Sequence, residues 1–135
     1  MIRDRKALID AVRSYFAPRD GARVVLVFGS VADGSFTDSS DVDVGVAGKG
    51  VLGYDEIATM GADLSEALGR PVDIVDLEAA AGLVVREALV RGIRVKLDRN
   101  LYVRLHTRML AEREDFWPLK RAMQAARIGR FVHGS

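Results

Sequence analysis

The sequence predicts a single α/β domain in which helices pack on a small mixed sheet. Short runs rich in β-branched residues alternate with stretches of helical periodicity, and glycine or proline ends most of these stretches. With 135 residues, of which 49% are hydrophobic, the chain can fill one core. It has no cysteine, which excludes disulfide scaffolds, zinc–thiolate sites and thiol nucleophiles.

The first part of the chain is predicted as helix, strand, loop and strand. Apolar residues at helical spacing predict a helix over residues 3–16. The valine-rich run at 23–28 predicts a buried strand, and residues 29–40, rich in Gly, Ser, Thr and Asp, predict a loop. Strict alternation at 41–47 predicts a second strand with valines on one face and aspartates and a glycine on the other.

The middle of the chain repeats this pattern of helix and strand. A turn at 48–53 leads into a helix over 55–68, which Gly69 ends. A strand follows at 71–75. A helix over 78–91 and a short strand over 93–97 complete this part.

The last part of the chain differs in charge. Residues 1–98 carry 12 Lys/Arg and 16 Asp/Glu, whereas residues 99–135 carry 8 Lys/Arg and 3 Asp/Glu. We interpret 1–98 as the core and 99–135 as a basic helical tail of the same domain that can bind a partner. Tyr102, Leu105 and Met109 form one helical stripe, and Pro118 is predicted to start or kink a further helix.

The chain shows no signal for a membrane or for secretion. No apolar run approaches the roughly 20 residues of a membrane span. The charged start, Met1-Ile2-Arg3-Asp4, lacks the apolar segment and cleavage site of a signal peptide. We therefore expect a soluble cytoplasmic protein.

Two aspartates on one strand predict a metal site. Asp41 and Asp43 project from the same face, about 6.6–7 Å apart along the backbone. Their carboxylates can converge on a hard cation, and oxygen ligands suit Mg²⁺ or Mn²⁺, which also bind substrate phosphates. Because like charges repel, this pair favours a bound cation.

Gly29 and Ser30 end the preceding strand and predict a phosphate site. Glycine lets the backbone approach a ligand closely, and the N–H groups at a helix start bind anions. A phosphate held there, near a metal held by Asp41 and Asp43, makes a site for a nucleoside triphosphate.

A third carboxylate is expected from the next strand, where Asp73 and Asp76 are the candidates. Their odd spacing sends them to opposite faces of an unbroken strand, so only one can join the site. Asp76 precedes the predicted helix at 78–91 and is interpreted as its N-cap. Asp73 is therefore assigned to the site.

This constellation resembles the nucleotidyltransferase superfamily that includes DNA polymerase β. It is most similar to the minimal (MNT-type) nucleotidyltransferases found as antitoxins beside HEPN-domain toxins. The likeness covers about residues 1–98. It rests on Gly29-Ser30, Gly34 and a ten-residue spacer that ends in Ser40. Asp41-Val42-Asp43 and the later Asp73 complete it, and Val31 stands where the minimal group often carries arginine.

The resemblance implies a polymerase β palm-like fold and a protein adenylyltransferase. In that group, AMP passes from ATP to a tyrosine of the partner HEPN ribonuclease and blocks this toxin. Asp41, Asp43 and Asp73 would then hold two Mg²⁺ ions, with Mn²⁺ as a substitute, and Asp73 would help to deprotonate the acceptor. Gly29, Ser30 and Ser40 would contact the nucleotide, with the β- and γ-phosphates held by Gly29 and Ser30.

Two other functions stay open. The chain could transfer a nucleotide to a small-molecule hydroxyl, as antibiotic nucleotidyltransferases do, although those carry an additional helical domain for the acceptor. It could also neutralise a partner by binding alone through the basic tail. A nucleic-acid polymerase is disfavoured, because the chain has no room for template-binding domains and its body is acidic.

Overall fold

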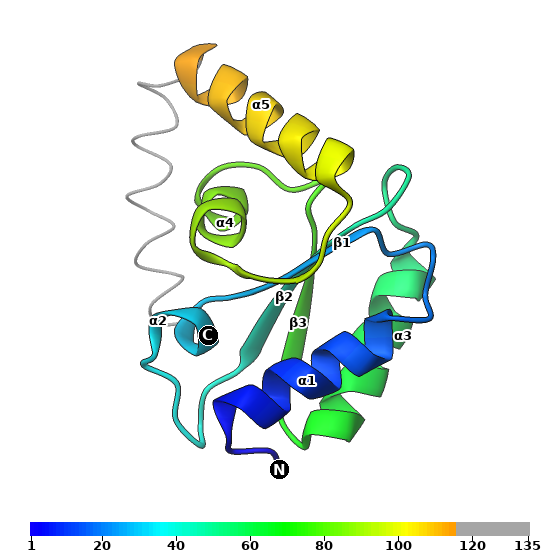
Figure 1. Cartoon of the computed structure of the whole chain (residues 1–135), viewed down its shortest axis with the longest axis vertical. Helices are drawn as coiled ribbons and strands as arrows, with labels where there is room; N and C mark the ends of the chain where they lie inside the picture. The colour runs from blue at the N-terminus through cyan, green and yellow to red at the C-terminus, as the bar shows by residue number, and fades with distance from the viewer. Residues whose placement is uncertain (116–135) are drawn as a thin grey trace.

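A computed structural model of the chain describes residues 1–115, and the side chains of residues 1–112. The elements, in order, are α1 (Arg5–Phe16), β1 (Val24–Phe28), α2 (Ser30–Asp33), β2 (Val42–Ala47), α3 (Tyr54–Leu68), β3 (Val72–Asp76), α4 (Leu83–Arg86), η1 (Glu87–Arg91), β4 (Ile93–Lys96) and α5 (Arg99–Asp115). Figure 1 shows α1 and α3 together on one side of the sheet, and α4 and α5 on the other.

The four strands form one mixed sheet in the order β3-β2-β1-β4. β2 runs parallel to β3, while β1 is antiparallel to both β2 and β4. The prediction of helices on a small mixed sheet is therefore confirmed. The parallel β2–β3 pair is connected through α3, which contacts β3.

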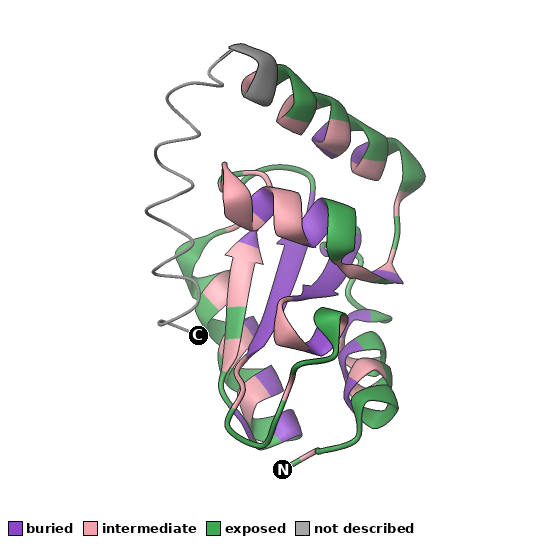
Figure 2. Cartoon of the chain, turned by 90° about the vertical axis from the view of Figure 1, so that its left-hand side faces the viewer, coloured by how far each residue is buried: buried purple, intermediate pink, exposed green. Residues whose placement is uncertain are grey.

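Each face of the sheet has its own hydrophobic cluster (Figure 2). Val42, Val44 and Val46 of β2 pack against α1 and α3, as the alternation predicted. On the other face, Leu26 and Phe28 of β1 pack against α4, η1 and α5. The strands in the middle of the sheet are buried throughout, because helices cover both sides.

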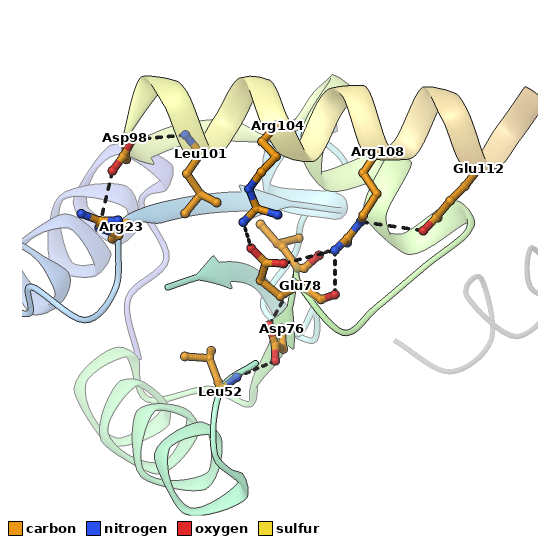
Figure 3. Close-up of polar contacts among 10 residues, drawn as sticks. Arg23, Leu52, Asp76, Glu78, Asp98, Leu101, Arg104, Arg108 and Glu112 are labelled. Carbon is orange, nitrogen blue, oxygen red and sulfur yellow. Dashed lines mark hydrogen bonds and ion pairs between the residues drawn. The ribbon is translucent and has the colours of Figure 1, made fainter. Parts of the chain in front are cut away.

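The first turns of α5 attach it to the second face. Leu101 and Leu105 are buried there, and the Tyr102 hydroxyl donates a hydrogen bond to the Leu89 carbonyl at 3.0 Å. Figure 3 shows Glu78 beneath α5, where its carboxylate pairs with two arginines of that helix. The predicted stripe of Tyr102, Leu105 and Met109 is confirmed as the packed side of α5. The prediction at Pro118 lies outside the described residues.

The structure corrects two predicted elements. The segment 29–40 is not loop throughout, because Ser30–Asp33 forms the short helix α2. The helix predicted from residue 78 begins only at Leu83. Gly82 has a φ of +78°, which a right-handed helix cannot contain, so the helix starts after it. This helix then ends in a π-helical turn, η1.

The interpretation of Asp76 as a helix N-cap was wrong. Its carboxylate accepts hydrogen bonds from the N–H groups of Leu52, at 2.8 Å, and Glu78, at 3.0 Å (Figure 3). Asp76 thus ties the turn after β3 to the loop before α3. None of the described helices is both long enough and apolar enough to cross a membrane.

Candidate active site

The register of the sheet brings the predicted carboxylates together. Asp43 of β2 pairs in parallel register with Asp73 of β3. Paired residues on neighbouring strands lie about 4.8 Å apart and project to the same face. Asp41 precedes Asp43 by two residues and shares that face. Asp76, by contrast, pairs with Val46, whose side chain packs against α1 and α3 on the opposite face.

The three carboxylates differ in their exposure. Asp43 is buried, with 7% of its surface exposed, while Asp41 is half-buried and Asp73 is exposed. The hydrophobic cluster beneath α4, η1 and α5 lies further along the same face, where Leu77 packs against Gly45. The carboxylates therefore occupy the end of this face that the helices leave open, with Asp43 at its base.

Gly29 lies directly against the buried carboxylate. It has a φ of +71°, and a Cβ placed on it would overlap a carboxylate oxygen of Asp43. Any other residue would be strained and would push against this side chain. α2 begins at Ser30, so the first N–H groups of a helix, which have no partner within it, start next to the carboxylates.

The metal-free site is electrostatically unfavourable. Burial, followed by the charges of Asp73 and Asp41, raises the pKa of Asp43 to about 7. Burial and the charge of Asp41 also raise the pKa of Asp73. A divalent cation would relieve this repulsion, and carboxylate oxygens on adjacent strands are the donor set that suits Mg²⁺ or Mn²⁺.

The carboxylates do not by themselves form a finished coordination sphere. In the part of the chain that the structure describes, no three acidic or histidine side chains converge closely enough for that. Mg²⁺ fits such a site, because it commonly takes one or two carboxylates and completes its shell with water and substrate phosphates. A cavity of about 340 Å³ lies elsewhere, among residues that include Tyr15, Val46 and Met60.

Ser40 has a structural role in this chain. Its hydroxyl accepts a hydrogen bond from the Thr37 N–H at 2.9 Å and so closes the turn that leads into Asp41. Ser30 stands at the first position of α2, where its carbonyl accepts from the Gly34 N–H at 3.1 Å. Contacts of either hydroxyl with a nucleotide stay predictions.

Three arginines that the sequence analysis did not single out hold the motif segment in place. Arg5 donates to the carbonyl of Val31 at 2.8 Å, and Arg3 pairs with Asp38 at 3.1 Å. Arg70, which is buried, donates to carbonyls in the loop before Asp41. Between a helix-ending glycine and a proline, Arg70 reads as an exposed turn residue, so no local signal could have found it.

Several solved structures of other proteins share the fold of this chain. A toxin–antitoxin structure with AMP-PNP matches at TM-score 0.75 and 16% identity, over 89% of this chain and 98% of that chain. A tri-AMPylated Shewanella oneidensis HEPN toxin in complex with MNT antitoxin matches at 0.71 and 14%, over 93% and 99%. A minimal nucleotidyltransferase matches at 0.55 and 36%, over 65% and 89%.

No curated protein matches the chain in sequence. The sequence profile named polymerase beta, nucleotidyltransferase, matches residues 10–100, which include all three carboxylates and Gly29. The resemblance to the superfamily of DNA polymerase β is therefore confirmed. This chain belongs to the polymerase β nucleotidyltransferase family.

Proposed function

We propose that this chain is an MNT-type antitoxin that transfers AMP from ATP to a tyrosine of a HEPN ribonuclease toxin. The observation that carries the proposal is one juxtaposition: Asp43 and Asp73 lie in register on adjacent strands, and Gly29 touches Asp43. Acidic groups for a metal therefore stand beside a backbone segment suited to phosphate, and a magnesium–nucleotide substrate needs both.

Each site residue has a distinct role in this proposal. Asp41 and Asp43 hold Mg²⁺, and Asp73 joins them from β3. Gly29 lets the backbone lie close to the Asp43 carboxylate, and the N–H groups at the start of α2 would donate to oxygens of the β- and γ-phosphates. When bound, the metal would neutralise the charge of the carboxylates and the triphosphate and stabilise charge that develops during transfer.

The transfer itself is a displacement at the α-phosphorus. The acceptor hydroxyl oxygen bonds to this phosphorus, the bond to the oxygen that bridges to the β-phosphate breaks, and pyrophosphate leaves with that electron pair. The proton of the hydroxyl passes to a carboxylate. Asp73 suits this role because it is the exposed member of the three and is therefore the one that an acceptor can reach from solvent.

The choice of a HEPN toxin as the partner is supported by the solved structures that share this fold, because they include toxin–antitoxin complexes. One of the matched structures is a toxin–antitoxin complex with AMP-PNP, and another contains a tri-AMPylated HEPN toxin with its MNT antitoxin. The excess of positive charge in residues 99–135 makes this segment our candidate for contact with the partner.

The test is transfer of label from ATP labelled at the α-phosphate, with Mg²⁺ and, as the acceptor, a HEPN protein if one is encoded by a neighbouring gene. We expect label on the partner with wild type and with Asp10→Asn, an exposed carboxylate on α1, but not with Asp41→Asn/Asp43→Asn. Peptide mapping should place the label on tyrosine. An unlabelled partner that is still neutralised would refute transfer and favour neutralisation by binding. Label on an added small-molecule hydroxyl instead would favour the antibiotic-type activity.

A further inference from the structure

We propose that Arg70 is a positioning residue that holds Asp41 in place for metal binding. The inference rests on the proposed function, because it takes Asp41 as a metal ligand. Arg70 lies outside the motif and belongs to the turn between α3 and β3. It acts through the backbone before Asp41 and is not proposed as a ligand of the metal or the substrate.

The guanidinium of Arg70 binds the loop that leads to Asp41. Its Nη1 donates to the carbonyl of Thr37 at 2.9 Å and to that of Ser40 at 3.0 Å. Its Nη2 donates to the carbonyl of Ile2 at 2.9 Å, and the group lies 5.0 Å from the centre of the Phe36 ring. One side chain thereby joins the motif loop to the N-terminal segment.

The residue after Arg70 secures the other side of Asp41. The carbonyl of Pro71 accepts a hydrogen bond from the Val42 N–H at 3.0 Å. The peptide group before Asp41 is thus bound by Arg70, through the Ser40 carbonyl, and the peptide group after it is bound by Pro71. Because both flanking peptides are fixed, the direction of the Cα–Cβ bond of Asp41 is fixed as well.

The same short segment also supplies the third carboxylate. Asp73 follows Pro71 by two residues and pairs with Asp43. Residues 70–73 therefore set the position of Asp41 and provide Asp73 at once. This double role gives a reason for a charged side chain in the turn before β3 that binds the loop before Asp41.

The burial of Arg70 is unfavourable for the stability of the fold. It is 4% exposed, and among the described residues no carboxylate lies within ion-pair distance of it. Its Nε is buried without a hydrogen-bond partner among the same residues. A buried cation whose partners are three carbonyls and the Phe36 ring is costly, so its presence beside a proposed metal-binding carboxylate favours a functional reason.

The test is the affinity of the full chain for Mn²⁺ added without nucleotide, followed by the electron paramagnetic resonance signal of free Mn²⁺. Arg70→Met removes the charge and the donors, and Arg70→Lys keeps the charge but loses the planar fork. We expect Arg70→Met to weaken Mn²⁺ binding by at least about tenfold, the usual effect of losing a residue that orients a ligand. Arg70→Lys should recover part of this loss.

Lys96→Met is the matched control. Lys96 also donates to two backbone carbonyls, those of Phe16 at 2.9 Å and Arg19 at 2.8 Å, but it braces the C-terminal end of α1. Its loss should lower the thermal stability and leave Mn²⁺ affinity unchanged. In label transfer to the partner, the Arg70 variants should need more Mg²⁺ for half-maximal rate yet approach the wild-type rate at saturation.

The outcomes separate this proposal from the function on which it rests. If wild type binds Mn²⁺ no better than Asp41→Asn, the proposed metal site itself fails. If wild type binds and folded Arg70→Met and Arg70→Lys bind equally well, only the role of Arg70 is overturned. Should Arg70→Met not fold, as judged by circular dichroism, Arg70→Lys decides the question by the same comparison.

Discussion

The buried carboxylate of Asp43 should make the metal-free protein less stable as the pH rises. Its pKa is raised from 3.8 to about 7 by burial and by two neighbouring carboxylates. A raised pKa means that the folded state holds the proton more tightly than the unfolded state does. The stability that this proton supplies is complete below about pH 4 and is lost as the pH approaches 7, after which no more is lost.

The size of this loss follows from the shift in pKa. A shift of one unit corresponds to about 1.4 kcal/mol, so a shift from 3.8 to about 7 corresponds to about 4 kcal/mol. Asp43→Asn has nearly the same shape and carries no charge at any pH. The variant should therefore unfold at a higher temperature than wild type above pH 7, by about 15 °C for a domain of this size.

The assay is thermal unfolding by circular dichroism in EDTA between pH 4.5 and 8.5. The gap between Asp43→Asn and wild type should widen with pH up to about 7. Saturating Mn²⁺ should raise the unfolding temperature of wild type and leave that of Asp43→Asn unchanged. A gap that is constant over the pH range, or absent, would refute the assigned electrostatics.

Three further predictions concern residues in the candidate site and around it. Gly29→Ala should cost at least twice the free energy of unfolding that Gly34→Ala costs, about 1 kcal/mol, in urea titrations. Both glycines have positive φ, but only a Cβ at Gly29 meets a carboxylate. Asp73→Asn should slow label transfer by about 100-fold with the fold intact, whereas Asp76→Asn should lower stability and leave the rate per folded molecule unchanged. Glu78→Gln should weaken the ion pairs with Arg104 and Arg108 and so speed hydrogen exchange of the backbone amides of α5. The free energy of opening of α5 should fall by about 1–2 kcal/mol, and unchanged exchange would contradict this pairing.

Local patterns were sufficient to predict most of the fold. The alternation at 41–47 assigned the faces of β2 correctly, because one face is apolar and the other is not. The late start of the helix predicted at 78–91 and the wrong N-cap at Asp76 have a common cause. Residues 79–81 favour a helix by composition, but the backbone at Gly82 is in a conformation that no helix contains. Helix propensity does not report where a glycine takes a positive φ.

The site was predictable to the extent that it is local. Asp41, Asp43 and Gly29 lie within one motif, and the choice of Asp73 over Asp76 needed only the two-residue period of a strand. The role that we infer for Arg70 was not predictable in this way. Its partners are the carbonyls of residues far away in sequence, and backbone carbonyls leave no trace in the identity of the residues that carry them.

Two features at this end of the sheet act against stability, and their coincidence is an argument for a charged ligand. Asp43 is buried beside two other carboxylates, and Arg70 is buried without an anion among the described residues. By contrast, Lys96 is only partly buried, and it donates to the Phe16 carbonyl at the C-terminal end of α1. Such costs collect where a site must be organised before its ligand arrives. A divalent cation bound with a nucleoside triphosphate would relieve the repulsion at Asp43 and so would account for the first of these costs directly. The role inferred for Arg70, which is to hold Asp41 in the orientation that the cation requires, would account for the second.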